Sequence, residues 1–247
     1  MPEVHDIEAV VFDVLGTMVD EPGGLRAAIS EAVSASAERS DERSDDGPDD
    51  GPADATVDHL LTVWQEHVEH EQQRIAKGSR AYASTEVIDR EAAHRVAGRA
   101  GLTDGPAIER LATASQRLAP WHDTLAGLAR LARHFPVLGL SHAGRATLLR
   151  LNAHAGLRWH QALSAEDARA YKPAPEVYRL AIDAAGCAPE RVLMVAAHAW
   201  DLRGAQAVGM RTAYVRRPGG DPPKSGDTFG LHAEGLDELV TALTAVQ

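Results

Sequence analysis

The stretch Glu8-Ala-Val-Val-Phe-Asp13-Val-Leu-Gly-Thr-Met18 joins a short apolar run to an acid and a glycine-containing turn. A continuous apolar run of this length is typical of a strand buried on both faces of a parallel sheet. Three later runs have the same character: 136–140, which ends before Ser141, 191–195, which precedes AAHAWD, and 212–215. The sequence therefore predicts a parallel sheet that contains these four strands.

Helical patterns alternate with the predicted strands. Apolar residues recur every three or four positions in 122–133 and 145–155, and a final helix is expected at 235–246. The stretch 216–228 is rich in Pro and Gly and is expected to be a loop, to which the sequence assigns no chemistry. Strands that alternate with helices predict an α/β fold with a doubly wound, Rossmann-like parallel sheet.

More than a hundred residues separate the first two predicted strands, far more than one crossover helix needs. Within this gap, 25–35, 57–77 and 85–100 have helical periodicity. We therefore expect a helical cap at 19–103, inserted after the first strand, and a core formed by 1–18 and 104–247. Residues 36–56 are acidic and contain no large apolar side chain, so they are expected to form a disordered loop within the cap.

Composition narrows the class of protein. The 247 residues are 44% hydrophobic and 25% charged, as in an ordinary globular enzyme, and no apolar run is long enough for a membrane span. The single cysteine, Cys187, excludes an internal disulfide and a paired-cysteine zinc site, and it fits a reducing cytoplasm. A net charge of −11 argues against nucleic acid as a partner, because nucleic-acid binding depends on Lys and Arg.

Polar residues follow the predicted strands where each strand ends. Asp13, Ser141 and the turn after 195 should meet, because ligands of doubly wound sheets bind at the carboxyl ends of the strands. Asp13 precedes a glycine-containing turn whose backbone N–H groups can face a ligand carboxylate or phosphate. An acid in this place is a candidate nucleophile, which would form an aspartyl intermediate that water then hydrolyses.

Four motifs resemble those of the haloacid dehalogenase (HAD) superfamily, and more narrowly the type II (S)-2-haloacid dehalogenases. They are, in chain order, Phe12-Asp13-Val14-Leu15-Gly16-Thr17-Met18, Leu140-Ser141, Tyr171-Lys172-Pro173 with Tyr178, and Ala199-Trp200-Asp201 with Gly204-Ala205. The segment Arg117-Leu118-Ala119-Pro120-Trp121 resembles the point where the chain of that family re-enters the core. The resemblance implies a HAD core with a cap and a hydrolase that uses Asp13 as its nucleophile.

The resemblance also implies roles for the other motif residues. Lys172 would keep Asp13 ionised, Asp201 would orient Lys172 or the hydrolytic water, and Thr17 would donate its hydroxyl to the nucleophile. The substrate-binding set would comprise Val14, Leu15, Ser141, His142, Gln65, Tyr178 and Trp200. The expected partner is a small-molecule carboxylate, and proteins of this kind are commonly homodimers.

Two positions argue against a phosphatase of the same superfamily. Leu15 stands where those enzymes carry a second Asp as the general acid, and Leu15 can donate no proton. Ala197 stands where a second magnesium-binding carboxylate would lie, four residues before Asp201. We therefore expect no metal and no cofactor, and a displacement at carbon that converts a 2-haloacid and water to a 2-hydroxy acid and halide.

Other positions depart from the dehalogenase pattern. The Arg that receives the halide follows a Trp on the first long cap helix in that family, whereas Trp64 is here followed by Gln65. Arg26, Arg74 and Arg80 are the open alternatives for this cation. His142 and His198 replace two asparagines, and His198 is the candidate base that activates water.

Three alternatives to a haloacid dehalogenase are open, and the missing Arg motivates the first of them. A strained ring such as an azetidine-2-carboxylate could also be opened by displacement, without a halide acceptor. A phosphatase is disfavoured by Leu15 and Ala197. A noncatalytic binding protein is disfavoured because it would need none of Asp13, Lys172 and Asp201.

Overall fold

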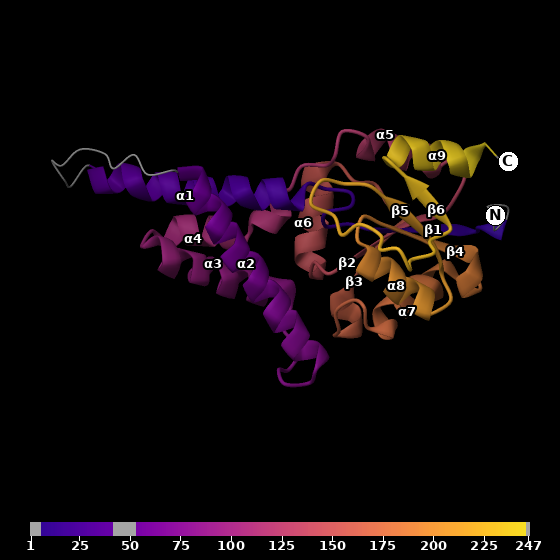
Figure 1. Ribbon diagram of the computed structural model, residues 1–247, viewed down its shortest axis with the longest axis horizontal. Helices are drawn as coiled ribbons and strands as arrows, with labels where there is room; N and C mark the ends of the chain where they lie inside the picture. The colour runs from indigo at the N-terminus through magenta and orange to yellow at the C-terminus, as the bar shows by residue number, and fades with distance from the viewer. Residues whose placement is uncertain (1–5, 42–52, 246–247) are drawn as a thin grey trace.

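The computed structural model of the chain describes residues 6–41 and 53–245. It confirms an α/β fold in which helices surround one parallel sheet (Figure 1). In chain order the elements are β1 (Ala9–Asp13), α1 (Glu21–Asp41), α2 (Ala53–Ala76), α3 (Thr85–Ala100), α4 (Gly105–Ala112), η2 (Ala114–Arg117), α5 (Thr124–Leu131), β2 (Val137–Ser141), α6 (Arg145–Ala155), β3 (Gln161–Ser164), η3 (Ala165–Ala168), α7 (Pro175–Ala185), η4 (Pro189–Arg191), β4 (Val192–Ala196), α8 (Ala199–Ala207), β5 (Arg211–Val215), β6 (Leu231–Ala233) and α9 (Leu236–Thr244).

The sheet has the strand order β3-β2-β1-β4-β5-β6, and every neighbouring pair is parallel. The four strands expected from the sequence are β1, β2, β4 and β5. The sequence did not predict β3 and β6, which lie at the two edges of the sheet. Both are short, and β3 begins with two exposed residues, so neither has the continuous apolar run that marks a buried strand.

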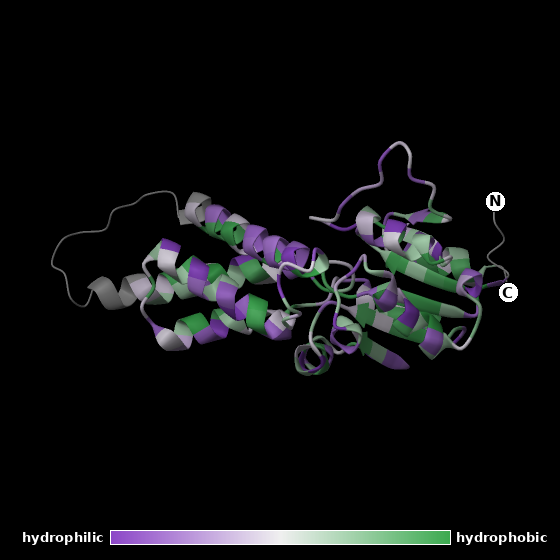
Figure 2. Ribbon diagram, turned by 90° about the horizontal axis from the view of Figure 1, so that it is seen from below, coloured by the Kyte–Doolittle hydropathy of each residue, from purple (hydrophilic) through white to green (hydrophobic). Residues whose placement is uncertain are grey.

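Strand β1 is buried on both faces of the sheet. Val10 and Phe12 belong to one hydrophobic cluster with residues of α5, α6 and α9. Ala9 and Val11 point the other way, into a second cluster with α7 and α8. Helices therefore cover both faces, which explains why β1 is continuously apolar rather than alternating. Figure 2 shows this difference between strands and helices: the strands inside the sheet domain are mostly green, that is hydrophobic, whereas the helices carry mixed colours.

Helices α1 to α4 form a separate group beside the sheet domain (Figures 1 and 2). They surround their own hydrophobic cluster, which includes Ile29 of α1, Trp64 of α2, Val96 of α3 and Leu111 of α4. The sequence prediction assigned α4 to the core, starting at 104. Because α4 packs in the helical cluster, we place the boundary after η2 instead.

The acidic stretch 36–56 is helical at both ends, where the sequence predicted a loop. Helix α1 continues to Asp41 and α2 begins at Ala53. Polar residues do not break a helix by themselves, since Glu, Arg and Ser are tolerated on an exposed helix face. The remainder of the predicted loop, 42–52, lies outside the described residues.

The N-terminus of α3 joins the helical group to the sheet domain at the N-terminus of α6. The Thr85 hydroxyl accepts a hydrogen bond from the Gly144 N–H at 2.8 Å, and Glu86 accepts one from the Thr147 hydroxyl at 2.8 Å. The Tyr171 hydroxyl donates to the Ala83 carbonyl at 2.8 Å. These contacts fix the helical group next to the carboxyl edge of the sheet.

Within residues 6–41 and 53–245, we find no helix that combines the length and the apolar character needed to cross a membrane.

Candidate active site

Three polar segments meet at the carboxyl edge of the sheet. Asp13 is the last residue of β1, and Ser141 is the last residue of the neighbouring strand β2. On the other side of β1, strand β4 ends at Ala196 and leads through His198 into α8. Parallel strands end at the same edge, so the fold brings these segments together as the sequence predicted.

Asp13 is buried and is held by two donors. The Thr17 hydroxyl donates to Asp13 Oδ2 at 2.6 Å, and Lys172 Nζ donates to Asp13 Oδ1 at 2.8 Å. Thr17 Oγ1 in turn accepts a hydrogen bond from the Ala197 N–H at 3.0 Å. Each carboxylate oxygen of Asp13 therefore has a fixed partner, which orients the carboxylate.

Lys172 bridges two buried carboxylates. Its ammonium lies 2.8 Å from Asp13 Oδ1 and 2.8 Å from Asp201 Oδ2. The Tyr178 hydroxyl donates to Asp201 Oδ1 at 2.7 Å, so Tyr178 lies in the network through Asp201 rather than at Asp13. Tyr178 and Asp201 are wholly buried. Because a buried charge is costly without partners, the four side chains depend on one another.

The two carboxylates that share Lys172 differ in acidity. Burial raises the pKa of Asp13, but Lys172 and His198 lower it by more, so the pKa of Asp13 lies below its usual value. Burial raises the pKa of Asp201 above its usual value, although Lys172 and Tyr178 act in the opposite direction. Burial lowers the pKa of Lys172, yet the two carboxylates raise it above its usual value. The negative charge is thus favoured on Asp13, as a nucleophile requires.

His142 and Ser141 are turned toward the protein backbone. His142 Nε2 accepts a hydrogen bond from the Lys172 N–H at 2.9 Å, and burial lowers the pKa of His142 to about 3. The ring is therefore neutral, and it packs edge-on against Tyr171. Ser141 Oγ accepts a hydrogen bond from the Ala143 N–H at 3.1 Å. His142 thus supports the segment that carries Lys172.

His198 lies beside the nucleophile candidate. Its Nε2 is 4.0 Å from Asp13 Oδ2, and its side chain is 19% exposed. The ring stacks against Trp200 with the ring centroids 5.9 Å apart. His198 is the residue before α8, and Asp221 anchors the start of that helix by accepting the N–H groups of Ala199 and Trp200. Both the ring and the backbone of His198 are therefore held in place.

The turn after Asp13 is fixed by residues that lie far away in the sequence. Gly16 has a φ of 75°, a conformation that favours glycine, and its carbonyl accepts from Trp121 Nε1 at 3.1 Å. The Thr17 carbonyl accepts from Arg217 Nε at 2.9 Å, and Arg217 forms a buried ion pair with Asp123 at 2.8 Å. These contacts set the position of the Thr17 hydroxyl.

Sequence reasoning missed the residues that support this turn. Arg217 and Asp221 lie in the loop 216–228, to which the sequence assigned no chemistry, and there they support the turn after Asp13 and the start of α8. Arg217 is 94 residues from Asp123 and 200 from Thr17, so no local pattern could reveal these contacts. The structure places Val14, wholly buried, and Leu15, half-buried, directly after Asp13 in the same turn.

The residues offered as a halide acceptor all lie in the helical group, and the three arginines among them are paired with carboxylates there. Gln65 is exposed on α2. Arg26 is paired with Asp58, Arg74 with Glu71, and Arg80 with both Glu71 and Glu91. Each of these three arginines therefore already faces a carboxylate within the helical group.

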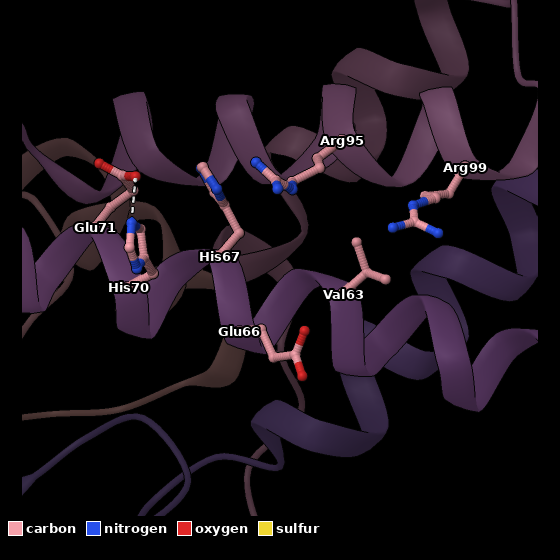
Figure 3. A pocket seen from close by; sticks show the side chains of 7 residues that line it. All are labelled: Val63, Glu66, His67, His70, Glu71, Arg95 and Arg99. Carbon is pink, nitrogen blue, oxygen red and sulfur yellow. Dashed lines mark ion pairs between the residues drawn. The ribbon is translucent and has the colours of Figure 1, made fainter.

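A separate cavity of about 330 Å³ lies between α2 and α3. Figure 3 shows its lining side chains, which are Val63, Glu66, His67, His70, Glu71, Arg95 and Arg99. His67 Nε2 lies 3.4 Å from a carboxylate oxygen of Glu91. None of the residues around Asp13 lines this cavity. In the part of the chain that the structure describes, no group of three or more His, Cys, Asp or Glu side chains could hold a metal ion.

A sequence model of the haloacid dehalogenase-like hydrolases matches residues 7–209. The chain belongs to this family of hydrolases. The resemblance inferred from the four motifs is therefore confirmed for the family, and all four motifs of this haloacid dehalogenase-like hydrolase lie within the matched residues.

Individual relatives extend the match over most of the chain. An (S)-2-haloacid dehalogenase of Xanthobacter autotrophicus is 31% identical over 215 residues, which cover 85% of this chain and 76% of the relative. The (S)-2-haloacid dehalogenase H-109 of Pseudomonas putida is 28% identical over 241 residues, with 96% and 97% covered.

Solved structures agree with this hydrolase in fold over nearly the whole length of the chain. The crystal structure of one L-2-haloacid dehalogenase superposes with a TM-score of 0.80 at 30% identity, and covers 97% of this chain and 99% of its own. A defluorinating L-2-haloacid dehalogenase gives a TM-score of 0.79 at 27% identity, with 96% and 95% covered.

Proposed function

We propose that this hydrolase is a 2-haloacid dehalogenase that works through an ester of Asp13. The observation that supports this most directly is the Asp13 carboxylate itself, which is ionised, oriented by Thr17 and Lys172, and followed two residues later by the apolar Leu15. The relatives that match this chain over most of its length are named as dehalogenases of (S)-2-haloacids. The substrate class is therefore a small carboxylate with a halogen at C2.

In the first step, an oxygen of Asp13 attacks C2 of the substrate. A new C–O bond forms, the carbon–halogen bond breaks, and the halide leaves with the electron pair. Attack from the face opposite the halogen inverts the configuration at C2. Halide needs no proton to depart, which fits Leu15 in the place where a general acid would otherwise stand.

In the second step, water attacks the carboxyl carbon of the Asp13 ester. His198 is the proposed base, because its Nε2 lies 4.0 Å from Asp13 Oδ2. The ester C–O bond on the Asp13 side breaks, and the products are a 2-hydroxy acid and the regenerated carboxylate. Lys172, held by Asp201, offsets the negative charge that develops on the ester oxygen.

The proposed substrate-binding set divides into two groups on this structure. Val14, Leu15, Ser141 and Trp200 lie at or beside the Asp13 edge, and we propose that they contact the substrate. His142 and Tyr178 contact Lys172 and Asp201, and we propose that they position these two side chains. Gln65 is exposed on α2, and we propose that it contacts the substrate from the helical group.

The other expectations from the sequence stay proposals. We propose that α1 to α4 act as the cap over the site, that the protein works in the cytoplasm, and that it can form a homodimer. Opening of an azetidine-2-carboxylate is not favoured, because the named relatives are haloacid dehalogenases. A phosphatase remains disfavoured by Leu15 and Ala197.

A single turnover in oxygen-18 water tests the proposal. Excess enzyme is mixed with (S)-2-chloropropionate without added metal, and the tryptic peptide that carries Asp13 is weighed by mass spectrometry. One oxygen-18 atom in Asp13, together with one chloride per substrate, is the expected result, and Asp13→Asn should give neither. Chloride release with oxygen-18 found only in the product would mean that water, not Asp13, attacks C2.

A further inference from the structure

Glu21 is an acid near the Asp13 edge to which neither the sequence motifs nor the proposed mechanism assigns a role. It opens helix α1, and its side chain reaches back toward the turn that follows Asp13. A Cβ at Gly16 would lie 2.7 Å from His198 Nε2 and 3.9 Å from Glu21 Oε2. The imidazole of His198 and the carboxylate of Glu21 therefore converge on the same point beside Gly16, which is free of a side chain.

His198 Nε2 thus has two carboxylates nearby. One is Asp13, with Oδ2 at 4.0 Å, and the other is Glu21 beside Gly16. Trp200 stacks on the ring and Asp221 anchors the helix that follows it, so the ring is held in place near both acids. Glu21 comes from the helical group and His198 from the sheet domain, so the pair spans the junction between them.

Three ionisable groups act on Glu21: His198 before α8, Asp89 on α3 and Asp13 on β1. Burial raises the pKa of Glu21 to about 7, Asp89 and Asp13 add to this, and His198 acts against it. Glu21 is half-buried, so it also has access to solvent. A carboxyl group with these properties exchanges a proton readily at neutral pH.

The proposed reaction must release a proton. A haloacid and water give a hydroxy acid, a halide ion and one proton. During ester hydrolysis, water loses two protons: one ends on the hydroxyl of the 2-hydroxy acid, and the other must leave the site. Asp13 does not retain it, because the low pKa of Asp13 keeps that carboxylate ionised.

We propose that Glu21 acts through His198 as a positioning residue, and that its carboxylate stabilises the protonated imidazole and takes up the proton that ester hydrolysis releases. This inference rests on the proposed function. In its ionised form Glu21 attracts the imidazolium, and the proton then passes from Glu21 to solvent. Glu21 acts only on the second step, because displacement of halide transfers no proton.

The test compares Glu21→Gln with wild type across pH 5.5 to 9 in single turnovers of (S)-2-chloropropionate. Chloride release reports ester formation, and lactate release reports ester hydrolysis. Gln has nearly the shape of protonated Glu and carries no charge. Glu21→Gln and wild type should therefore hydrolyse the ester at the same rate near pH 5.5. Above pH 7 the variant should be slower by on the order of tenfold, with chloride release unchanged. Glu21→Asp should restore part of the pH dependence.

Glu31→Gln is the matched control. Glu31 lies on the same helix with an exposed side chain, so this variant removes the same charge away from the site and should behave as wild type. A rate ratio between Glu21→Gln and wild type that is constant across pH would overturn the inference, because it would indicate a structural role. Absence of chloride release from wild type would overturn the proposed function and this inference with it, and so is distinct from the first outcome.

Discussion

Asp13 and Lys172 are 159 residues apart in the chain, yet their side chains form a buried ion pair at 2.8 Å. The same ammonium lies 2.8 Å from Asp201, so one cation serves two buried carboxylates. The positive charge of Lys172 is therefore shared between Asp13 and Asp201. The chemistry and the stability of the site thus depend on the same side chain.

Replacing Lys172 by Met should remove both properties. Two carboxylates then lose their cation, and we expect the free energy of unfolding to fall by about 3–5 kcal/mol and the rate of chloride release by on the order of a thousandfold. Urea denaturation and a chloride assay measure the two effects. Lys224→Met, at an exposed position, is the control and should change neither. A stable Lys172→Met protein with normal turnover would contradict the proposed role.

Replacing Arg217 by Met should disturb the turn after Asp13, because this turn is held by the Arg217 side chain. Asp123 would then be buried without its cation, and the Thr17 carbonyl would lose its donor. We expect a loss of about 3–5 kcal/mol in the free energy of unfolding and slower ester formation. The neighbouring Arg216→Met provides a close control, because Arg216 is exposed and pairs only with exposed Glu234. Equal losses in the two variants would show that the Arg217–Asp123 pair has no special importance.

Replacing His198 by Asn should separate the two chemical steps. Asn has no basic nitrogen, so we expect ester hydrolysis to slow by about a hundredfold, while ester formation continues. Rapid quenching followed by intact-mass measurement should then detect the protein with the substrate's carbon skeleton attached through C2 as an ester of Asp13. His94→Asn, at an exposed position on α3, should accumulate no ester. If His198→Asn slowed both steps equally, His198 would not be the base.

Asp89 should make the protein less stable as pH rises. Burial raises the pKa of Asp89 to about 7, whereas an unfolded Asp titrates near its ordinary value. Between these two values the folded state binds more protons than the unfolded state, so the free energy of unfolding decreases as pH increases toward 7. The shift corresponds to at most about 4 kcal/mol.

Asp89→Asn tests this dependence, because Asn can still accept the hydrogen bond that the Ser115 hydroxyl donates. The variant should be more stable than wild type at pH 8 and about equal at pH 4, as measured by denaturation at each pH. Asp183→Asn removes an exposed acid and should follow wild type throughout. A variant that is destabilised at pH 8 would show that the Asp89 carboxylate is favourably ionised in the folded protein.

Local signals explain the parts of the fold that the sequence predicted well. Helices α3 and α6 begin and end where periodicity placed them, and both are followed by a glycine in the left-handed conformation, Gly101 and Gly156. The strand ends were predictable because a buried apolar run stops at a polar residue, as at Asp13 and Ser141.

The remaining features depend on contacts that no local pattern encodes. Glu21 resembles an ordinary acid in the first turn of a helix, and only the fold brings it beside His198. The resemblance placed Tyr178 in the substrate-binding set, and its partner Asp201 became known only from the geometry. The acidic stretch 36–56 is helical at both ends because α1 and α2 extend beyond the apolar residues that marked these helices in the sequence.

The order of synthesis has a consequence for this site. Asp13 leaves the ribosome well before Lys172, Asp201 and Arg217, which lie more than 150 residues later in the chain. A nascent chain that ends before residue 172 carries Asp13 without its cation, and it also lacks β4, one of the two neighbours of β1 in the sheet. A chain that ends between residues 201 and 216 has both, but its turn after Asp13 still lacks the contact with Arg217. Neither chain should have hydrolase activity, so the enzyme becomes competent only once Arg217 has been made.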